Sequence, residues 1–346
     1  MNSQPPGQPE SRVWFVDIAK GIAISLMVLG HVLGGLTIRG FFREPGPASD
    51  IRGWLYTFHM ATFMFLSGLF LDASLVKGFS RFLLGRLGRL YYPSVIWGAI
   101  NILCANLFWQ FTNGHMGYRV LVGLLYDPTS YSWFLMTLLE LSILYSLLRV
   151  WAPPGGIFVI SGLGYLLILR LDMPVVTHLF WWAIWISLGS FLSHWVRTCA
   201  KLPLAVTAAS CLVFAAVSAG GYRYLVSPDA RNAILTAAGI GMVLCISSVI
   251  DRMGSLRVAR KMLLHAGRRS LEIYLLHSVA WVLARIILIN LLHVTNSTLL
   301  LVLLVAAGVV MPIAVADCAE RLNCSWLFSL NLTRFSKIGQ AQEVHA

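Results

Sequence analysis

Charged residues are scarce in this sequence. Asp, Glu, Lys and Arg together make up 12% of the 346 residues, whereas hydrophobic residues make up 58%. A soluble domain carries roughly 25% charged residues, so the composition excludes an ordinary water-soluble enzyme. Long polar stretches are missing too, since the longest internal ones are residues 37–53 and 112–131. Any chemistry must therefore take place in or against a bundle of membrane-embedded helices.

Metal and disulfide patterns are also missing. The 6 cysteines contain no C-x-x-C pair, and no pair of histidines shows metal-ligand spacing. The sequence thus predicts neither a metal site nor a disulfide framework.

Acidic residues are few as well, 14 against 26 Lys and Arg, which gives a net charge of +12. This excess would suit nucleic acid, but 17 of the basic residues lie on one side of the predicted spans and only 7 on the other. The positive-inside rule accounts for such a bias, so we expect both termini in the cytoplasm and no nucleic-acid partner.

Apolar runs of about 17 to 24 residues are long enough to cross a bilayer as helices. Because unsatisfied backbone groups are costly in lipid, the sequence predicts an all-α, polytopic membrane helix bundle. We divide the chain into an N-terminal tail (1–12), a transmembrane domain (13–316) and a C-terminal tail (317–346), and we expect the first apolar run to be retained and not cleaved as a signal peptide. The ten predicted spans are approximately residues 13–36, 54–75, 90–111, 132–151, 155–171, 178–196, 203–220, 233–250, 270–292 and 298–316. The Pro/Gly-rich joins "APPGG" (152–156) and "YPS" (92–94) are predicted to be turns or helix starts.

Three ionisable residues interrupt the first span, "VWFVDIAKGIAISLMVLGH". Lys20 and His31 are eleven residues apart, which at ~100° per residue places both on one face of the helix, ~16 Å apart along its axis. Asp17 precedes Lys20 by three residues, so we expect it to pair with the ammonium group. Lys20 would lie in the cytoplasmic half and His31 near the outer end.

The second span runs back from the outside and places His59 at a depth similar to that of His31, with Ser67 deeper. The stretch "KGFSRFLLGRLGRLYYP" then leaves at the cytoplasmic side and carries Arg86 and Arg89. We expect a cationic mouth below the level of the two histidines, although each of these residues taken alone also suits a structural role.

Three further spans carry polar or aromatic groups. Glu140 lies near the middle of one span, where an acid is expensive unless it pairs or lines a polar cavity. Another span carries Glu272 near its cytoplasmic entrance, His277 about 8 Å further in, and Arg285 in its outer half. The motif "HLFWWAIW" (178–185) suits an aromatic belt at the membrane surface, and a sugar-stacking platform is the alternative.

Five strings occur in a fixed order: "DIAKGIAISLMVLGH", "FHMATFMFLSG", "RLGRLYYP", "WFL" (which begins with Trp133) and "RRSLEIYLLH". In these motifs the chain resembles the acyltransferase-3 family of integral membrane O-acyltransferases. The resemblance implies a bacterial cytoplasmic-membrane enzyme that transfers an acyl group, usually acetyl, from cytoplasmic acyl-CoA to a hydroxyl of an extracytoplasmic glycan. It implies acetyl-CoA as donor substrate and no permanently bound cofactor. The family's pattern of a basic residue and a histidine falls on Lys20 and His31, where arginine is the commoner basic residue.

The residues and the resemblance together suggest a mechanism. Arg86 and Arg89 would bind the CoA phosphates, with Lys20 at the entrance of a channel that leads to His31. His31 would act as general base on the acceptor hydroxyl, or as a transient acyl carrier. His59 would orient the acceptor or stabilise the oxyanion. Asp17, Ser67, Trp133, Glu140, Glu272 and His277 complete the site in supporting or acceptor-binding roles.

Two other functions compete with this interpretation. A transporter or proton-coupled carrier would also use intramembrane histidine, glutamate and arginine groups, but it should show repeated halves, and we see none. A non-catalytic membrane scaffold would retain the fold and tolerate replacement of His31.

Overall fold

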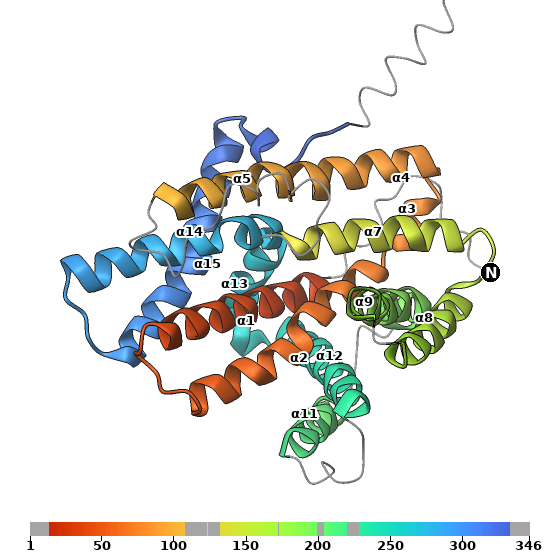
Figure 1. Cartoon of the computed structure of the whole chain (residues 1–346), viewed down its shortest axis with the longest axis horizontal. Coiled ribbons are helices and arrows are strands. Elements are labelled where there is room, and N and C mark those ends of the chain that lie inside the picture. Colours follow the sequence, from red (N-terminus) through yellow and green to blue (C-terminus); the bar gives the residue numbers. More distant parts are fainter. Residues whose placement is uncertain are drawn as a thin grey trace, which may run out of the picture.

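The structure is a computed structural model that describes residues 14–107, 123, 132–171, 173–198, 204–219 and 228–332. The elements of this part of the chain are all helical, as predicted (Figure 1). They are α1 (Trp14–Ile38), α2 (Pro47–Gly68), α3 (Leu71–Leu75), α4 (Phe79–Arg86), the π-helix η1 (Leu87–Tyr91), α5 (Tyr92–Leu107), α7 (Trp133–Leu148), α8 (Pro154–Leu169), α9 (Pro174–Phe191), α10 (Ser193–Thr198), α11 (Leu204–Ala219), α12 (Pro228–Arg252), the 3-10 helix η2 (Gly254–Leu256), α13 (Arg257–Arg268), α14 (Ser270–Ile286), the π-helix η3 (Ile287–Leu291), α15 (Ser297–Arg321) and the 3-10 helix η4 (Ser325–Leu327).

Many of these helices have the length and apolarity of membrane spans. In the described part of the chain, six meet both conditions: Trp14–Ile38, Phe79–Leu107, Pro174–Phe191, Asn232–Arg252, Ser270–Leu291 and Ser297–Arg321. Three further apolar helices are shorter: Trp133–Leu148, Pro154–Leu169 and Ala205–Ser218. The helices do not share one direction, because α1 runs along the long axis in Figure 1 whereas α9 is seen nearly end-on. The count of ten spans and the cytoplasmic termini stay predictions.

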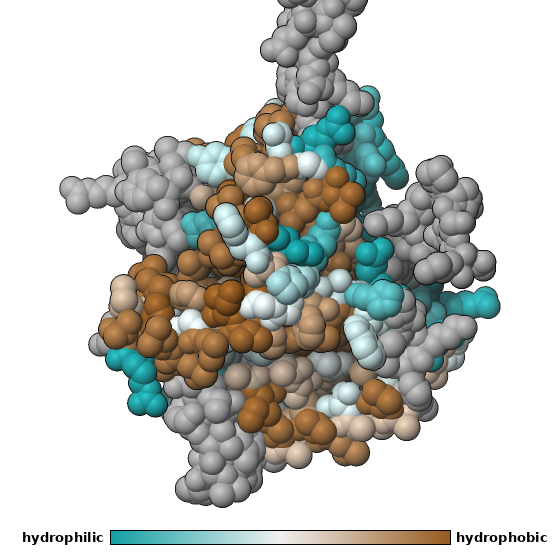
Figure 2. Space-filling model, turned by 90° about the vertical axis from the view of Figure 1, so that its right-hand side faces the viewer, coloured by the Kyte–Doolittle hydropathy of each residue, from teal (hydrophilic) through white to brown (hydrophobic). Residues whose placement is uncertain are grey.

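Large apolar side chains lie on the outside of the bundle. On α8, Leu163, Leu166 and Leu167 are each more than 60% exposed, and on α15 Val302 is 60% exposed. Figure 2 shows broad hydrophobic areas on one face of the molecule, with hydrophilic residues gathered mainly in its upper part. Such exposure is costly in water and neutral in lipid, so it fits a protein embedded in a bilayer.

Helix α1 is the central element of the bundle. It packs against α2, α12, α13, α14 and α15. Most of its residues are buried, including Ile18, Ala23 and Val28, because the helix is apolar on nearly every side. A helix of this kind is stable only when other helices surround it. The ionisable residues of α1 are therefore held in a fixed frame.

One of the helices around α1 lies between the predicted spans 233–250 and 270–292, where the sequence predicts only a connection. Residues 257–268 form α13, which crosses α1 closely enough for backbone contact. A Cβ atom on Gly21 would lie 2.1 Å from the carbonyl oxygen of Leu263, and one on Gly267 would lie 1.8 Å from that of Asp17. Only glycine permits such an approach. The Asp17 end of α1 is thus pinned by α13.

The prediction for "YPS" (92–94) is partly wrong. The sequence predicted a turn or a helix start there, but α4, η1 and α5 form one continuous helix from Phe79 to Leu107. Pro93 is accommodated directly after the π-helix η1, where it leaves a carbonyl to be satisfied from elsewhere. The other proline-rich join was predicted correctly, because α8 begins at Pro154.

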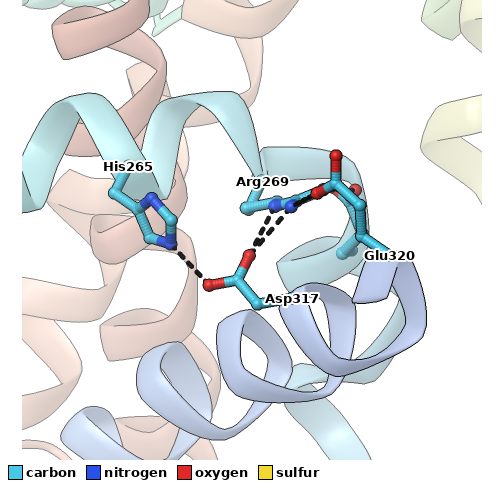
Figure 3. A network of polar contacts seen from close by, with 5 residues as sticks. His265, Arg269, Asp317 and Glu320 are labelled. Carbon is cyan, nitrogen blue, oxygen red and sulfur yellow. Dashed lines mark hydrogen bonds and ion pairs between the residues drawn. The ribbon is translucent and has the colours of Figure 1, made fainter. Parts of the chain in front are cut away.

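A polar network joins α13, α14 and α15 (Figure 3). Asp317 accepts hydrogen bonds from His265 and from Arg269, both at 3.0 Å, and Arg269 also pairs with Glu320. Arg269 makes a further, longer contact of 3.4 Å with Glu272. Asp317 and Glu320 belong to α15, which continues to Arg321 and so extends beyond residue 316, the predicted end of the transmembrane domain. The predicted supporting residue Glu272 belongs to this network.

Candidate active site

A cavity of about 690 Å³ opens between α1, α2, the segment from α3 to η1, α7 and α14. Its basic lining residues are Lys20, Lys77, Arg81, Arg86 and Arg89, and no carboxylate is among the described residues that line it. A space with five cations and no acid attracts anions, phosphates in particular.

The opposite part of the cavity wall is apolar. Ile24 lies one turn beyond Lys20 on the same face of α1, and α2 contributes Phe63 and Leu66. Phe134 and Leu138 of α7 follow the same helical spacing. The cavity therefore combines a cationic part with an apolar part, which suits a ligand that has an anionic end and a long, uncharged arm.

Lys20 lies at the junction of the two parts. Its side chain is half-buried, and its Nζ atom lies 5.8 Å from the ring centroid of Phe70. The guanidinium of Arg197 lies 5.7 Å from the same ring. Cations are attracted to the faces of aromatic rings at these distances. Phe70 thus gathers two positive charges beside the cavity, a role that its sequence position, just past the end of α2, did not suggest.

The structure gives Asp17 a partner that the sequence did not predict. Its carboxylate lies 3.9 Å from the guanidinium of Arg268 on α13. The expected pairing of Asp17 with Lys20 stays a prediction. Of the other predicted donor-site residues, Ser67, Arg86 and Arg89 all line the cavity.

A cluster of histidines lies beyond the apolar part. The ring centroids of His31 and His277 are 5.0 Å apart. The Tyr56 ring lies beside both His31, at 6.2 Å, and His59, at 5.3 Å. Helices α1, α2 and α14 each contribute one histidine, so residues far apart in the sequence form one group. We had expected His31 and His59 to lie together, but the proximity of His277 comes from the tertiary structure.

The three histidines differ in exposure and hydrogen bonding. His59 and His277 are buried, with 3% and 5% of their surface exposed, whereas His31 is exposed. The Nδ1 atom of His59 lies 2.5 Å from the carbonyl oxygen of Leu55, and that of His277 lies 2.8 Å from the carbonyl oxygen of Tyr274. Because a carbonyl only accepts, both Nδ1 atoms carry the proton, and in the neutral ring both Nε2 atoms are acceptors.

The apolar part of the cavity lies next to this cluster of histidines. Phe63 lies one helical turn from His59, and the ring of Tyr274 is 6.3 Å from that of His277. Ile24 precedes His31 by seven residues, or about 10 Å along the helix. None of the three histidines lines the cavity, but a neighbour of each does, so the cluster lies beyond the apolar part of the cavity.

Trp133 and Glu140 lie outside this cavity. The Trp133 ring packs against Trp182, with centroids 5.4 Å apart, and against His178, at 5.9 Å. A groove of about 380 Å³, lined in part by His178, Tyr165 and Trp181, lies beside this aromatic cluster. Glu140 is half-buried on α7 and has no hydrogen bond or ion pair with another described residue. The structure does not place Trp133 or Glu140 beside the histidine cluster.

Sequence reasoning missed a polar network on the other side of α7. Asp72 of α3 pairs with Arg149 at 2.9 Å and accepts hydrogen bonds from Ser190 and, at 3.3 Å, from the hydroxyl of Tyr145. The only sequence signal was an aspartate near the end of the predicted span 54–75. The network fixes α3, and thereby the start of the segment that carries the basic residues of the cavity.

The described residues contain no group of three or more His, Cys, Asp or Glu side chains that could hold a metal ion. A comparison with known families matches residues 13–317 to the family described as an acyltransferase domain, the acyltransferase-3 family. Neither a curated protein nor a solved structure matches the chain.

Proposed function

The chain belongs to the acyltransferase-3 family, and from this premise we propose that it moves an acyl group, acetyl in the first instance, from cytoplasmic acyl-CoA to a hydroxyl of an extracytoplasmic glycan. The family match makes the protein a membrane acyltransferase. The observation that carries the proposal is that one cavity has both a cationic part and an apolar part, with a histidine cluster beyond the apolar part. An acyl-CoA has matching chemistry, with phosphates at one end and a thioester on a long arm at the other.

The donor would bind with its phosphates against Arg86 and Arg89. Arginine suits this role because its planar guanidinium donates two parallel hydrogen bonds to a phosphate. Lys20, a compact charge beside the Phe70 ring, would take a position further along the cavity, and Ser67 offers a hydroxyl on the wall. The thioester arm would lie along Ile24 and Phe63 and end near the histidines.

The chemical step assigns the proton to His31. This side chain is exposed, so an acceptor hydroxyl can approach its unprotonated ring nitrogen. As the hydroxyl oxygen attacks the thioester carbonyl, His31 takes its proton, the C–S bond breaks, and the departing CoA thiolate receives that proton from His31, which returns to its neutral form. Direct transfer of this kind needs no acyl-histidine intermediate.

His59 would orient the acceptor hydroxyl. Its Nδ1–H group is engaged with Leu55, so in the neutral ring the free Nε2 atom accepts a hydrogen bond and cannot donate one to an oxyanion. Of the two roles expected for His59, this hydrogen bond favours orientation. His277 would support the ring of His31, with Ser278 donating to the Nε2 atom of His277 at 3.2 Å.

The arrangement suits substrates from opposite sides of a membrane. In our proposal both termini lie in the cytoplasm of a bacterium, the cavity opens to the cytoplasmic side of the inner membrane, and the glycan reaches His31 from outside. The excess of basic residues on one side of the predicted spans supports this orientation.

The test is the O-acetyl content of envelope glycans, measured by proton NMR of the acetyl methyl group. Cells that lack the gene are complemented with the wild type, with His31→Ala, or with His194→Ala as a matched control, because His194 is exposed on α10 and does not line the cavity. We expect acetylation to return with the wild type and the control but not with an equally abundant His31→Ala protein. Unchanged acetylation in all strains would contradict the proposal and favour the transporter.

A further inference from the structure

The chain after α15 turns back and packs against the helix that carries Arg86 and Arg89. Phe328 is buried and stacks on Trp97 of α5, with ring centroids 5.4 Å apart and planes 10° apart. The indole N–H of Trp97 donates to the carbonyl oxygen of Leu327 at 2.8 Å. Further along, the backbone N–H of Leu330 donates to the carbonyl oxygen of Gly88 at 2.9 Å. We call residues 327–332 the return segment.

The last of these bonds meets a need that the helix itself creates. In the π-helix η1 the N–H of Tyr92 donates to the carbonyl of Leu87, five residues earlier. The same pattern would pair the carbonyl of Gly88 with the N–H of residue 93, but residue 93 is proline and has none. Because Gly88 is buried, water cannot replace this donor, and an unpaired carbonyl there would cost free energy. The N–H of Leu330 supplies the missing donor.

The contact also explains the glycine. A Cβ atom at position 88 would lie 2.1 Å from the carbonyl oxygen of Leu330 and 3.5 Å from the side chain of Leu332. Any other residue would push the return segment away from η1. The proline and the glycine of "RLGRLYYP" therefore act together. Pro93 leaves the carbonyl of Gly88 without a donor in the helix, and the absence of a side chain at Gly88 lets Leu330 approach and supply one.

The residues next to Gly88 line the acyl-donor cavity. Arg86 lies two positions before it, and Arg89 and Leu90 directly after it. A π-helix without a partner for its central carbonyl would relax towards α-helical geometry, which turns the residues on its two sides relative to one another. We propose that the return segment, through Leu330 and Gly88, holds Arg86 and Arg89 in the geometry that binds the anionic end of the acyl donor. This inference rests on the proposed function.

The test compares two substitutions at one position in the full-length protein in detergent. Leu330→Pro removes the backbone donor, whereas Leu330→Ala keeps it and is the matched control. We expect Leu330→Pro to raise the Kd of CoA, measured by calorimetry, and the KM of acetyl-CoA by about tenfold, with kcat at saturating donor within about twofold of the wild type. Leu330→Ala should change the Kd less than about threefold. Such a split of KM from kcat would not follow from a general loss of fold.

Two further variants guard against misfolding at position 330. Trp97→Phe removes the bond to Leu327 and retains a ring for Phe328, and it should shift the Kd in the same direction. Trp326→Ala, at an exposed side chain just before the return segment, should not. If the wild type binds CoA and the folded Leu330→Pro and Trp97→Phe variants bind it equally well, the inference is overturned. If the wild type itself does not bind CoA, the proposed function fails instead.

Discussion

Arg86 and Arg89 line the same cavity, but the structure predicts that they contribute unequally to donor binding. Arg86 is half-buried, and its guanidinium lies 5.2 Å from the centre of the Phe82 ring. Arg89 is exposed. A buried guanidinium is held in place and poorly screened by solvent, whereas an exposed one loses most of its attraction to water and salt. We therefore expect Arg86→Gln to weaken the binding of CoA more than Arg89→Gln.

The magnitudes follow from the two environments. A hydrogen bond to a charged group at a partly buried site contributes about 1.5–3 kcal/mol, so Arg86→Gln should raise the Kd of CoA about 10- to 150-fold. An exposed ion pair contributes about 0.5–1 kcal/mol, so Arg89→Gln should raise it only about 2- to 5-fold. The smaller effect should vanish in high salt, whereas most of the larger one should persist.

Calorimetric titration of CoA into the purified protein, at low and at high salt, measures both effects. Arg257→Gln is the matched control, because Arg257 is exposed on α13 and does not line the cavity, so this variant makes the same change in net charge. An Arg89→Gln effect as large as that of Arg86→Gln would refute the argument from burial. A Kd that responds equally to Arg257→Gln would show that only net charge matters.

Three further predictions concern stability, measured as thermal unfolding in detergent. His277→Ala removes a buried ring with two hydrogen bonds and should lower the unfolding temperature, at a cost of about 2–4 kcal/mol; an unchanged temperature would show that the histidine cluster is loosely packed. Asp72→Asn weakens a half-exposed ion pair with Arg149 and should cost only about 1 kcal/mol. Combining it with Arg149→Gln should cost less than the sum of the two single variants, because both remove the same pair. Gly21→Ala places a methyl group where the carbonyl of Leu263 lies and should cost at least about 2 kcal/mol, so a variant of wild-type stability would contradict the close crossing of α1 and α13.

Local patterns predicted a cationic site with Lys20, Arg86 and Arg89, and the structure places all three residues on the wall of one cavity. Lys20 lies one turn before Ile24 on α1, and Arg86 lies three residues before Arg89. Helical geometry alone therefore puts the two members of each pair on one face of a helix. The composition fixed the all-helical class because a bilayer leaves no other way to satisfy the backbone of long apolar runs. The turn or helix start predicted at "YPS" (92–94) is partly wrong, because the helix continues through it and the backbone donor that compensates for Pro93 comes from Leu330, more than two hundred residues away.

By itself, then, the sequence determined the helical class, the membrane environment and which residues of α1 and α2 share a helix face, because these depend on contacts within a few residues. Only the tertiary structure decided that His277 joins His31, that Phe70 gathers Lys20 and Arg197, and that Trp133 packs against Trp182 and not in the cavity. Each of these depends on how two or three helices cross. Crossings are set by close backbone approaches such as that of Gly21 to Leu263, which no local pattern encodes.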